Sequence, residues 1–508
     1  MPQSGPWAKS LPFLDAAACA PTASEIGLKG SHLSALAKLV SPAALAEIKV
    51  AVGPKGWSDD PAELERHLVD ERRLFRGKTP LLVRPASTAE VAAVLHVCHR
   101  HRIPVVPQGG NTGLVGGAVP HEHGGEILLS LARMNRIRDL DPLNYTMTAE
   151  AGCILANLQQ AAADADRLFP LSLGAEGSCT IGGNLSTNAG GVAVLRYGNA
   201  RELTLGLEAV LPDGRVWDGL RALRKDNTGY DLKQLFIGAE GTLGVITAAV
   251  LKLFPRPREI VTAFAAVPSP QAAIELLAHA RAGSGDQLSA FELMPRLGLE
   301  MDLKYLQGIV DPLAKRYEHY VLLEFATADA AGNFRDRIEA LLAAAIEKGV
   351  VLDATIAASE LQAKALWRIR EGIPEAQKIE GGGIKHDVSV PVSRIAQFIA
   401  EAKAACETLE PRVRVLAFGH VGDGNVHFNL CRPLDAAGDA FQARWEEFNR
   451  VVHDIVVRMG GSISAEHGIG RLKRGEFHRH ASATELAMMR AIKKTLDPLG
   501  LMNPGKLL

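Results

Sequence analysis

The chain is poor in aromatic residues and cysteine and has no surplus of charge of either sign. Phe, Trp and Tyr make up 5% of the 508 residues, and the formal net charge is −1 at pH 7. A neutral chain has no general electrostatic attraction to nucleic acid or to an anionic membrane. The six cysteines are scattered without a CxxC pair, which argues against a disulfide framework and favours a reducing compartment. We therefore expect a cytoplasmic protein that does not bind nucleic acid.

Long apolar runs are also missing. No stretch of about 18 uncharged apolar residues occurs, so no membrane-spanning helix is expected. The N-terminus lacks a cationic segment followed by an apolar run, which predicts no signal peptide. At 508 residues the chain is too long for one core, so we expect two or three domains. The composition predicts an N-terminal arm with short helices over 1–78 and domains over 79–257 and 258–508.

Glycine is abundant, with 49 residues, and it is clustered. The stretch 105–117, VVPQGGNTGLVGG, contains five glycines after two apolar residues. Such a loop can turn successive backbone N–H groups toward one anion. Its spacing differs from the Rossmann and Walker motifs, so we expect the pyrophosphate of a dinucleotide in another type of fold. The alternative is an ordinary glycine-rich surface loop.

The residues before this loop predict a nucleotide-binding unit. Ser87 and Glu90 have the spacing of a capping box, and the helix that follows ends near Arg102. This helix lies between two short apolar strands, an arrangement typical of α+β nucleotide-binding units. Two further glycine-rich segments occupy 173–191 and 238–244.

The composition changes near residue 258, where glycine becomes rarer and alanine-rich helices begin. Helices alternating with strands without strong turn signals indicate an antiparallel sheet covered by helices, and the fold class is α+β. We expect helices at 270–282, 333–348, 359–370 and 395–407, with strands at 318–325 and 414–418.

Two loops of the second half carry residues with metal-binding chemistry. A glycine-rich turn separates His420 from His427, and a second glycine-flanked loop carries Glu466 and His467. Two histidines and one carboxylate leave coordination positions open, the pattern of a catalytic metal site. These ligands suit zinc, with manganese or iron as competitors. The alternative is that each imidazole is a hydrogen-bonded loop residue.

Two cations precede these loops. Arg370 lies in a helix that we expect to end at Pro374, and Lys385 lies at the start of a strand that follows three glycines. Cations near a metal would suit a substrate that bears a carboxylate. The alternative is that both side chains are solvated at the surface.

Six segments, in this order, resemble the flavoprotein family of D-2-hydroxyacid dehydrogenases. They are PQGGNTGLVGG, GAEGSCTIGGNLSTNAGG, FIGAEGTLGVIT, FGHVGDGNVHFN, SAEHGIG and MNPGKLL. The family includes D-lactate dehydrogenase, the glycolate oxidase flavin subunit and D-2-hydroxyglutarate dehydrogenase. The resemblance runs from about Leu81 to the C-terminus. It implies a two-subdomain, PCMH-type (vanillyl-alcohol-oxidase) FAD-binding domain over 79–257 and an FAD-linked oxidase C-terminal domain over 258–508. The last 50 or so residues are expected to pack back on the FAD domain.

The resemblance also implies which residues hold the cofactor. The FAD pyrophosphate would be held by Pro107, Gly109, Gly110, Asn111, Thr112, Gly113 and Leu114. The isoalloxazine and ribityl chain would be lined by Gly177, Ile181, Gly182, Asn184, Asn188 and Gly190. The pocket would be completed by Gly241, Ile246 and Asn503. Covalent relatives commonly carry a histidine where this chain has Asn111, so we expect non-covalent FAD.

The reacting residues follow from the same resemblance. The metal ligands of the family match His420, His427 and Glu466, and its catalytic base matches His467. The substrate-binding positions of 2-hydroxyglutarate dehydrogenases match Arg370, Lys385 and Asn429. One position departs, because those enzymes can carry a threonine where this chain has Pro374. Proline has no hydroxyl, so a hydrogen bond to the distal carboxylate is lost and the substrate is left open.

The expected activity is FAD- and metal-dependent oxidation of a D-2-hydroxy acid, with hydride transfer to flavin N5. D-2-hydroxyglutarate is the first expectation, and a cytochrome- or quinone-linked D-lactate dehydrogenase or a glycolate oxidase-type enzyme is the alternative. The electron acceptor would be an electron-transfer flavoprotein or a quinone, with O₂ as the oxidase alternative, and a homodimer is left open. From the residues alone, a flavin-free metal-dependent hydrolase and a non-catalytic nucleotide-binding protein also remain open.

Overall fold

The computed structural model describes residues 40–329, 332–436 and 438–508. Of the N-terminal arm expected over 1–78, residues 1–39 lie outside the described part. The remainder contains two short helices, each with a proline in its first turn and a side-chain cap before it. They are α1 (Pro42–Val52) and α2 (Pro61–Glu65).

Residues 40–257 precede and include the domain expected to bind FAD and form the FAD-side region. Its first sheet has four strands in the order β1-β2-β4-β3. The strands are β1 (Trp57–Ser58), β2 (Leu82–Val83), β3 (Val105–Gln108) and β4 (Ile127–Ser130). Helix α3 (Thr88–His101) connects β2 to β3, which allows both to pair with β4 in parallel. The expected N-cap is confirmed, because Ser87 Oγ accepts the Glu90 N–H at 3.2 Å; the reciprocal bond of the Glu90 carboxylate goes to the Ala86 N–H at 2.8 Å, one residue before the N-cap.

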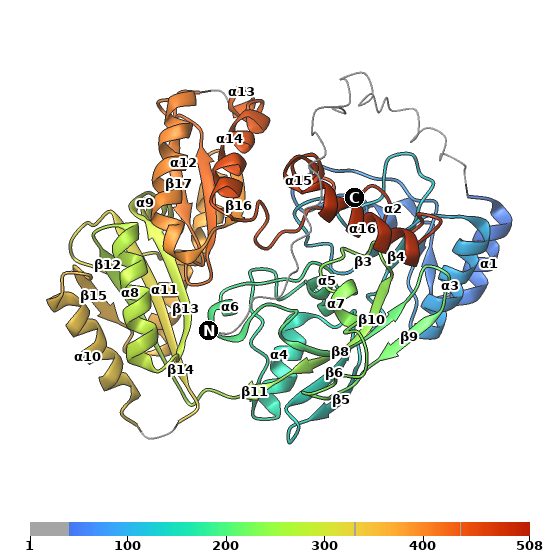
Figure 1. The fold of residues 1–508 in the computed structure, drawn as a ribbon, viewed down its shortest axis with the longest axis horizontal. Coiled ribbons are helices and arrows are strands. Elements are labelled where there is room, and N and C mark those ends of the chain that lie inside the picture. Colours follow the sequence, from blue (N-terminus) through green and yellow to red (C-terminus); the bar gives the residue numbers. More distant parts are fainter. Residues whose placement is uncertain (1–39, 330–331, 437) are drawn as a thin grey trace, which may run out of the picture. The chain divides into compact units, whose positions relative to one another are not determined.

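The second sheet has five antiparallel strands in the order β5-β6-β10-β8-β9 (Figure 1). They are β5 (Ile137–Asp141), β6 (Thr146–Glu150), β8 (Thr204–Val210), β9 (Val216–Gly219) and β10 (Val245–Lys252). Four helices connect or cover these strands: α4 (Leu155–Asp164), α5 (Ile181–Ser186), α6 (Val194–Tyr197) and α7 (Lys233–Phe236). A separate pair, β7 (Arg167–Leu168) with β11 (Phe254–Pro255), ends this region.

Helix α5 is a feature that the glycine-rich segment 173–191 did not predict. Glycine has low helix propensity, but here it permits close packing. A Cβ on Gly182 would lie 2.6 Å from the Cβ of Ala151, so only glycine allows α5 to approach the end of β6 this closely. The Gly182 N–H donates to the Ala151 carbonyl at 2.8 Å, which fixes the contact.

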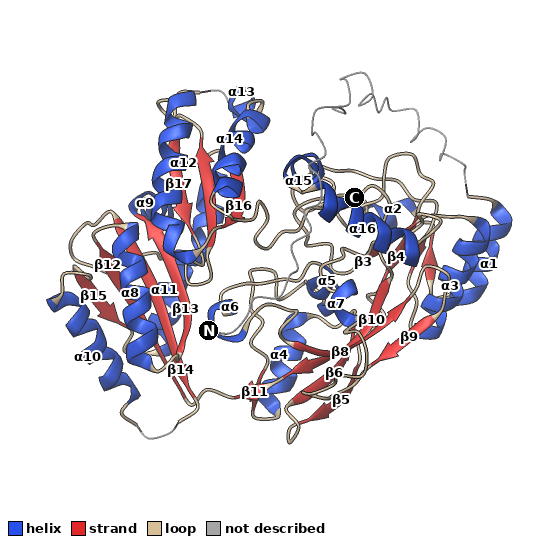
Figure 2. Cartoon of the chain, in the orientation of Figure 1, coloured by secondary structure: helices blue, strands red, loops and turns tan. Residues whose placement is uncertain are grey.

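The region after residue 258 contains the expected antiparallel sheet, here with four strands in the order β13-β14-β12-β15. They are β12 (Glu259–Val267), β13 (Leu288–Pro295), β14 (His319–Thr327) and β15 (Asp353–Ile356). Alternate residues of β12 belong to different cores. Ala263 and Ala265 pack with α8 (Pro270–Ser284) and α10 (Phe334–Glu347). Phe264 and Ala266 pack with α9 (Arg296–Tyr305) and α11 (Glu360–Ile379), so helices cover both faces (Figure 2).

A further antiparallel sheet, in the order β16-β18-β17, carries three of the expected site residues, Lys385, His427 and Asn429. Its strands are β16 (Gly383–Ser389), β17 (Arg414–Phe418) and β18 (Asn425–Cys431). One face, with Ile384 and Phe428, is covered by α12 (Ile395–Leu409) and α14 (Trp445–Arg458). Because side chains alternate along a strand, Lys385 and Asp387 lie on the opposite face. The register places them across from Asn429 and His427.

Helix α11 corrects one expectation, because it does not end at Pro374 but continues to Ile379. Proline lacks an N–H, so the helix loses only the bond that residue 374 would donate to the Arg370 carbonyl. Ile369, Ile373 and Ala376 are buried on one side of the helix, before and after the proline. Burial of this continuous apolar face outweighs the loss of one hydrogen bond.

The C-terminal residues bond to the first sheet. The chain ends with α15 (Arg474–His480), α16 (Ala483–Leu496) and a tail. A short helix, α13 (Gly438–Gln442), lies just before α14. The Asn503 N–H donates to the Val105 carbonyl at 2.8 Å, and the Val105 N–H donates to the Leu501 carbonyl at 2.9 Å. Among the described residues, no helix combines the length and the apolar composition needed to cross a bilayer.

Substitution of Gly182 tests the packing of α5. We expect Gly182→Ala to destabilise the apoprotein by about 1–3 kcal/mol, because the new methyl group meets Ala151 in a packed interior. Gly177→Ala is the matched control, since a Cβ at Gly177 meets no atom within 4 Å. Thermal unfolding of the two apoproteins measures the difference, and equal melting temperatures would contradict this role for Gly182.

Candidate active site

The three glycine-rich segments meet in space. A Cβ on Gly109 would lie 2.5 Å from Thr180 Oγ1, which places the first segment against the start of α5. A Cβ on Gly241 would lie 3.1 Å from Pro107, which brings the third segment against β3. The Glu240 N–H donates to the Ser186 carbonyl at 2.8 Å and joins the third segment to the second. One region of bare backbone therefore results from segments that are far apart in the sequence.

This region has features that fit FAD. Gly113 and Gly177 face open space, with no atom within 4 Å of an added Cβ, so backbone is available to a ligand there. Thr180 Oγ1 and Asn503 Oδ1 are buried without a hydrogen-bond partner among the described residues. Buried polar atoms without partners are uncommon in folded proteins, and a bound polar cofactor would supply the missing bonds.

Several residues expected at the cofactor instead have structural contacts. Asn111 has φ 56°, and its side-chain amide donates to the Val69 carbonyl at 2.9 Å. Asn188 Oδ1 accepts the Arg201 N–H at 3.0 Å. The remaining expected residues lie on the same segments or, for Ile246, on β10: Gly110 is exposed, Thr112, Leu114 and Gly190 are partly exposed, and Ile181, Asn184 and Ile246 are buried.

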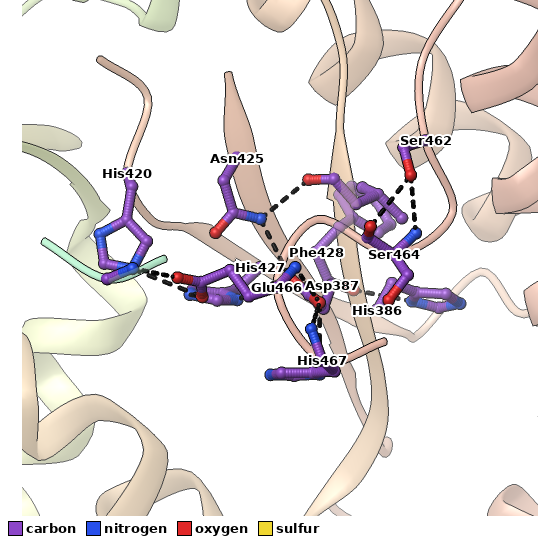
Figure 3. A network of polar contacts seen from close by, with 12 residues as sticks. His386, Asp387, His420, Asn425, His427, Phe428, Ser462, Ser464, Glu466 and His467 are labelled. Atoms are coloured by element: carbon purple, nitrogen blue, oxygen red, sulfur yellow. Dashed lines mark hydrogen bonds and ion pairs between the residues drawn. The ribbon is translucent and has the colours of Figure 1, made fainter. Parts of the chain in front are cut away.

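His420, His427 and Glu466 come together as expected (Figure 3). The two imidazole centroids are 5.3 Å apart, and the Nε2 atoms of His420 and His427 lie 3.8 and 3.9 Å from Glu466 Oε2. One ligand atom from each residue fits within 4.8 Å of the others. This donor set is typical of a divalent metal site with open positions.

Glu292, in β13, was not predicted and supports His420. Its Oε1 accepts from His420 Nδ1 at 2.6 Å, and its Oε2 accepts from Arg370 Nε at 2.6 Å. Burial opposes ionisation of Glu292, but His420 and Arg370 outweigh it and lower its pKa to about 2. Burial also opposes charge on His420, but Glu292 and Glu466 raise the pKa of His420 to about 9. The bond at Nδ1 leaves Nε2 directed at Glu466, as in many metal-bound histidines.

Asp387, in β16, is the second residue that sequence reasoning missed. Its Oδ2 accepts the backbone N–H groups of Glu466 and His467 at 3.0 and 2.9 Å, and its Oδ1 accepts from Asn425 Nδ2 at 3.0 Å. Burial opposes charge on Asp387, but His467, Lys473 and these N–H donors hold its pKa far below the usual range. The carboxylate therefore fixes the loop that carries Glu466 and His467.

His467 lies beside Asp387, with its Nδ1 at 3.4 Å from Asp387 Oδ2. The pKa of His467 is lowered to about 4, mainly because the imidazole is buried. Asp387 raises this pKa, and the cations Lys473, Arg72 and Lys385 lower it further. The imidazole is therefore neutral near pH 7. Because Nδ1 faces the carboxylate, Nε2 is the nitrogen left to accept a proton.

Two contacts join this loop to the FAD-side region. The Gly191 N–H donates to Glu466 Oε1 at 2.6 Å, at the end of the second glycine-rich segment. The buried Glu240 carboxylate accepts the N–H groups of Ile469 and Gly470, each at 2.7 Å. Glu240 lies in the third glycine-rich segment, and the sequence pattern did not predict this contact. These bonds place Glu466 and His467 beside the expected cofactor segments.

The expected substrate-binding residues lie on two paired strands and one helix. Lys385 and Asn429 face each other across β16 and β18, and Asn429 Nδ2 donates to Gln377 of α11 at 2.9 Å. Arg370 is buried on the same helix and pairs with Glu292, whereas Pro374 is exposed.

A second histidine cluster was not predicted. His121 Nδ1 lies 2.8 Å from buried Glu126, and His123 Nε2 lies 3.7 Å from it. Lys506, also buried, lies 3.5 Å from His121 and adds positive charge beside the cluster. A cation at this position disfavours a metal ion, so the cluster is better explained as the anchor of the C-terminal tail.

Comparison with known proteins agrees with this geometry. Residues 79–219 match the family described as FAD binding domain, and residues 256–507 match that described as FAD linked oxidases, C-terminal domain. A mitochondrial D-2-hydroxyglutarate dehydrogenase of Arabidopsis thaliana is 40% identical over 460 residues, which cover 91% of this chain and 80% of the relative. The chain belongs to the family of FAD-dependent D-2-hydroxyacid dehydrogenases. A putative mitochondrial D-lactate dehydrogenase of Schizosaccharomyces pombe is 40% identical, covering 88% of this dehydrogenase and 85% of the relative.

The solved structures confirm the predicted fold class. A p-cresol methylhydroxylase with bound substrate has a TM-score of 0.70 to this dehydrogenase at 16% identity, covering 92% of this chain and 96% of the other. The PCMH-type arrangement is therefore shown. The expected cytoplasmic location is wrong, because both relatives above are named as mitochondrial. Scattered cysteines indicate a reducing environment but do not separate one reducing compartment from another.

Substitution of Glu240 tests how the catalytic loop is held. In Glu240→Gln, the side-chain amide can accept at one atom only, so one of the Ile469 and Gly470 N–H groups loses its partner. We expect amide hydrogen exchange at these two residues to accelerate about tenfold or more. Glu208→Gln is the control, because this buried carboxylate binds Arg138 and Thr247 instead. Unchanged exchange at 469 and 470 would contradict the assignment.

Proposed function

We propose that this dehydrogenase oxidises D-2-hydroxyglutarate to 2-oxoglutarate with non-covalent FAD and a divalent metal ion. The observation that carries the proposal is the convergence of His420, His427 and Glu466 beside His467, at a loop bonded to Gly191 of the glycine-rich segment. This places a metal-type donor set, a neutral base and the expected cofactor backbone around one point. The relatives named as D-2-hydroxyglutarate dehydrogenases support the choice of substrate.

His420, His427 and Glu466 would hold the metal, which we propose to be zinc, with manganese or iron as alternatives. When bound, such an ion supplies a Lewis acid that lowers the pKa of a hydroxyl group. The three ligand residues have supporting partners of their own: Glu292 for His420, Asp387 near His427, and Gly191 for Glu466. This support keeps the donor atoms directed at one place in the absence of a ligand.

The glycine-rich backbone around Gly109, Gly113 and Gly177 would hold FAD, with Thr180 and Asn503 offering the unpartnered atoms. When bound, FAD supplies the acceptor for the hydrogen on the substrate Cα, taken as hydride. Asn111 stands where covalent relatives carry a histidine, which supports non-covalent attachment.

His467 would take the proton from the 2-hydroxyl group, so that loss of this proton and of the Cα hydride leaves a carbonyl. Its low pKa keeps the imidazole neutral and able to accept a proton. Asp387 holds Nδ1, orients the ring and stabilises the imidazolium that forms. The Asp387 carboxylate itself keeps its charge throughout.

Arg370, Lys385 and Asn429 would bind the carboxylates of the substrate. Arg370 balances Glu292 and brings positive charge to the His420 side, whereas Lys385 and Asn429 lie on the sheet face beyond Asp387. With both carboxylates and the 2-hydroxyl held, the single hydrogen on Cα points at the flavin in only one enantiomer, which we propose is the D form.

D-lactate is the second candidate substrate. A D-lactate dehydrogenase is among the relatives, and Pro374 offers no hydroxyl to a distal carboxylate. An electron-transfer flavoprotein or a quinone is the proposed acceptor of the electrons.

Removal of the base tests the proposed chemistry. We expect His467→Ala to retain FAD and metal but to lose about a hundredfold or more in turnover, because the variant lacks the imidazole that takes the hydroxyl proton. Anaerobic flavin reduction by D-2-hydroxyglutarate, followed at the flavin absorption band, measures the rate. Turnover near that of the wild type would remove His467 from this function.

Removal of a ligand tests the metal site. We expect His427→Gln to weaken metal binding by about 100-fold or more, since loss of a supporting residue alone typically costs 10–100-fold. His123→Gln is the control, because it changes the second histidine cluster, and it should retain the metal. Metal content is measured by elemental analysis, and exhaustive chelation of the wild type should abolish activity without releasing flavin. A metal lost from the His123 variant instead would refute the assignment.

A further inference from the structure

Arg72 lies in a tight turn that precedes the first glycine-rich segment. The Arg73 N–H donates to the Asp70 carbonyl at 2.9 Å, and the Asp70 N–H donates to the Phe75 carbonyl at 3.1 Å. The Asp70 carboxylate accepts the Phe75 N–H at 2.7 Å. The turn is thus closed on itself and presents Arg72 in a fixed backbone position.

The turn is held against the residues that follow the catalytic loop. A Cβ on Gly116 would lie 2.3 Å from the Phe75 ring, so the glycine allows close contact there. The Arg471 guanidinium lies 4.5 Å from the centroid of the same ring. The Arg471 N–H donates to the Val115 carbonyl at 2.9 Å and joins the two sides. Arg72 is therefore positioned beside the loop that carries Glu466 and His467.

The guanidinium of Arg72 has no partner of its own. It is half-buried and makes no hydrogen bond or ion pair within 40–329, 332–436 and 438–508. Its charge contributes to the lowered pKa of Lys385, whose main cause is burial, and also to that of His467 and Lys473. Asp387, followed by Asp70, is the acid with the largest effect on the pKa of Arg72, and the Asp387 carboxylate already accepts three N–H donors.

Lys385 is in the same situation. It is partly buried, and its side-chain ammonium makes no hydrogen bond or ion pair with the described residues. Two neighbouring cations that are both partly removed from water and both without a counter-ion repel each other. Such a pair is stable when an anion binds between them, and guanidinium groups bind carboxylates well.

The distance along β16 fits a dicarboxylic acid. Lys385 and Asp387 are two residues apart on one face, which corresponds to about 7 Å along a strand. Asp387 pairs with His427, so the metal ligands and His467 lie at one end of this interval. The carboxyl carbons of a five-carbon diacid are roughly 5 Å apart, for four C–C bonds of about 1.5 Å. A hydroxy acid held at the His427 end would reach Lys385 with its distal carboxylate.

We propose that Arg72 and Lys385 together bind the distal carboxylate of the substrate, and that Arg72 determines the preference for a dicarboxylic acid. This inference rests on the proposed function, because it assumes a 2-hydroxy acid bound at His427 and His467. Arg72 would provide, from the FAD-side region, the contact that Pro374 cannot make.

Paired substrates separate this contact from others. D-2-hydroxyglutarate and D-2-hydroxybutyrate share the reacting end, but only the first has a distal carboxylate. In the FAD-loaded Arg72→Gln enzyme, we expect kcat/KM for D-2-hydroxyglutarate to fall at least tenfold, mainly through KM, with that for D-2-hydroxybutyrate within about twofold of wild type. Arg72→Lys should recover part of the loss.

Arg73→Gln is the matched control, because it removes the same charge from the next residue of the turn, whose side chain is exposed. It should leave both substrates unaffected. As a readout without turnover, calorimetry should show 2-oxoglutarate binding at least tenfold more weakly to the Arg72→Gln holoenzyme than to wild type.

The outcomes distinguish a failure of the proposed function from a failure of the Arg72 assignment alone. A wild-type enzyme that does not prefer D-2-hydroxyglutarate over D-2-hydroxybutyrate would refute the proposed substrate and, with it, this inference. A wild type with that preference, unchanged in Arg72→Gln, would overturn the inference alone. An equal loss for both substrates in Arg72→Gln would place the arginine at the cofactor or the reacting end and would also overturn it.

Discussion

The buried carboxylate of Asp387 is the group on which the arrangement of the site depends. A buried charge is costly unless it is fully hydrogen-bonded, and this one accepts from two backbone N–H groups and from Asn425. The same bonds set the positions of Glu466 and His467, which are consecutive in the chain and have different functions. One satisfied carboxylate thus fixes a proposed metal ligand and the proposed base together.

The site is completed by chain segments from both halves of the sequence. Glu466 accepts from Gly191, and Glu240 accepts from Ile469 and Gly470, so the catalytic loop is bonded to the glycine-rich segments. Glu292 adds a carboxylate from β13 behind His420. None of these contacts supplies a reacting group. They hold the reacting groups in place before a ligand binds, which reduces the reorganisation needed for reaction.

The sequence predicted local structure better than it predicted the long-range contacts that hold the site residues in place. The N-cap at Ser87 and strand 414–418 could be identified because their signals lie within a few residues. His420, His427 and Glu466 could be proposed because glycine-flanked histidines and a matching family order were visible. Glu292 and Asp387 could not, because their partners are 128 and 79 residues away and an isolated acid has no local signature. Helix α11 passes Pro374 because tertiary burial overrides local propensity, which the sequence pattern alone does not reveal.

Anomalous X-ray scattering from crystals of the holoenzyme prepared with Mn²⁺ tests the central claim most directly. The account predicts one peak bounded by His420, His427 and Glu466, with Asp387 outside the coordination sphere. Within the described part of the chain, two other groups of donors are close enough to bind an ion: Asp387 with Glu466 and His467, and His121 with His123 and Glu126. A peak at either of these, with none between His420 and His427, would contradict the account.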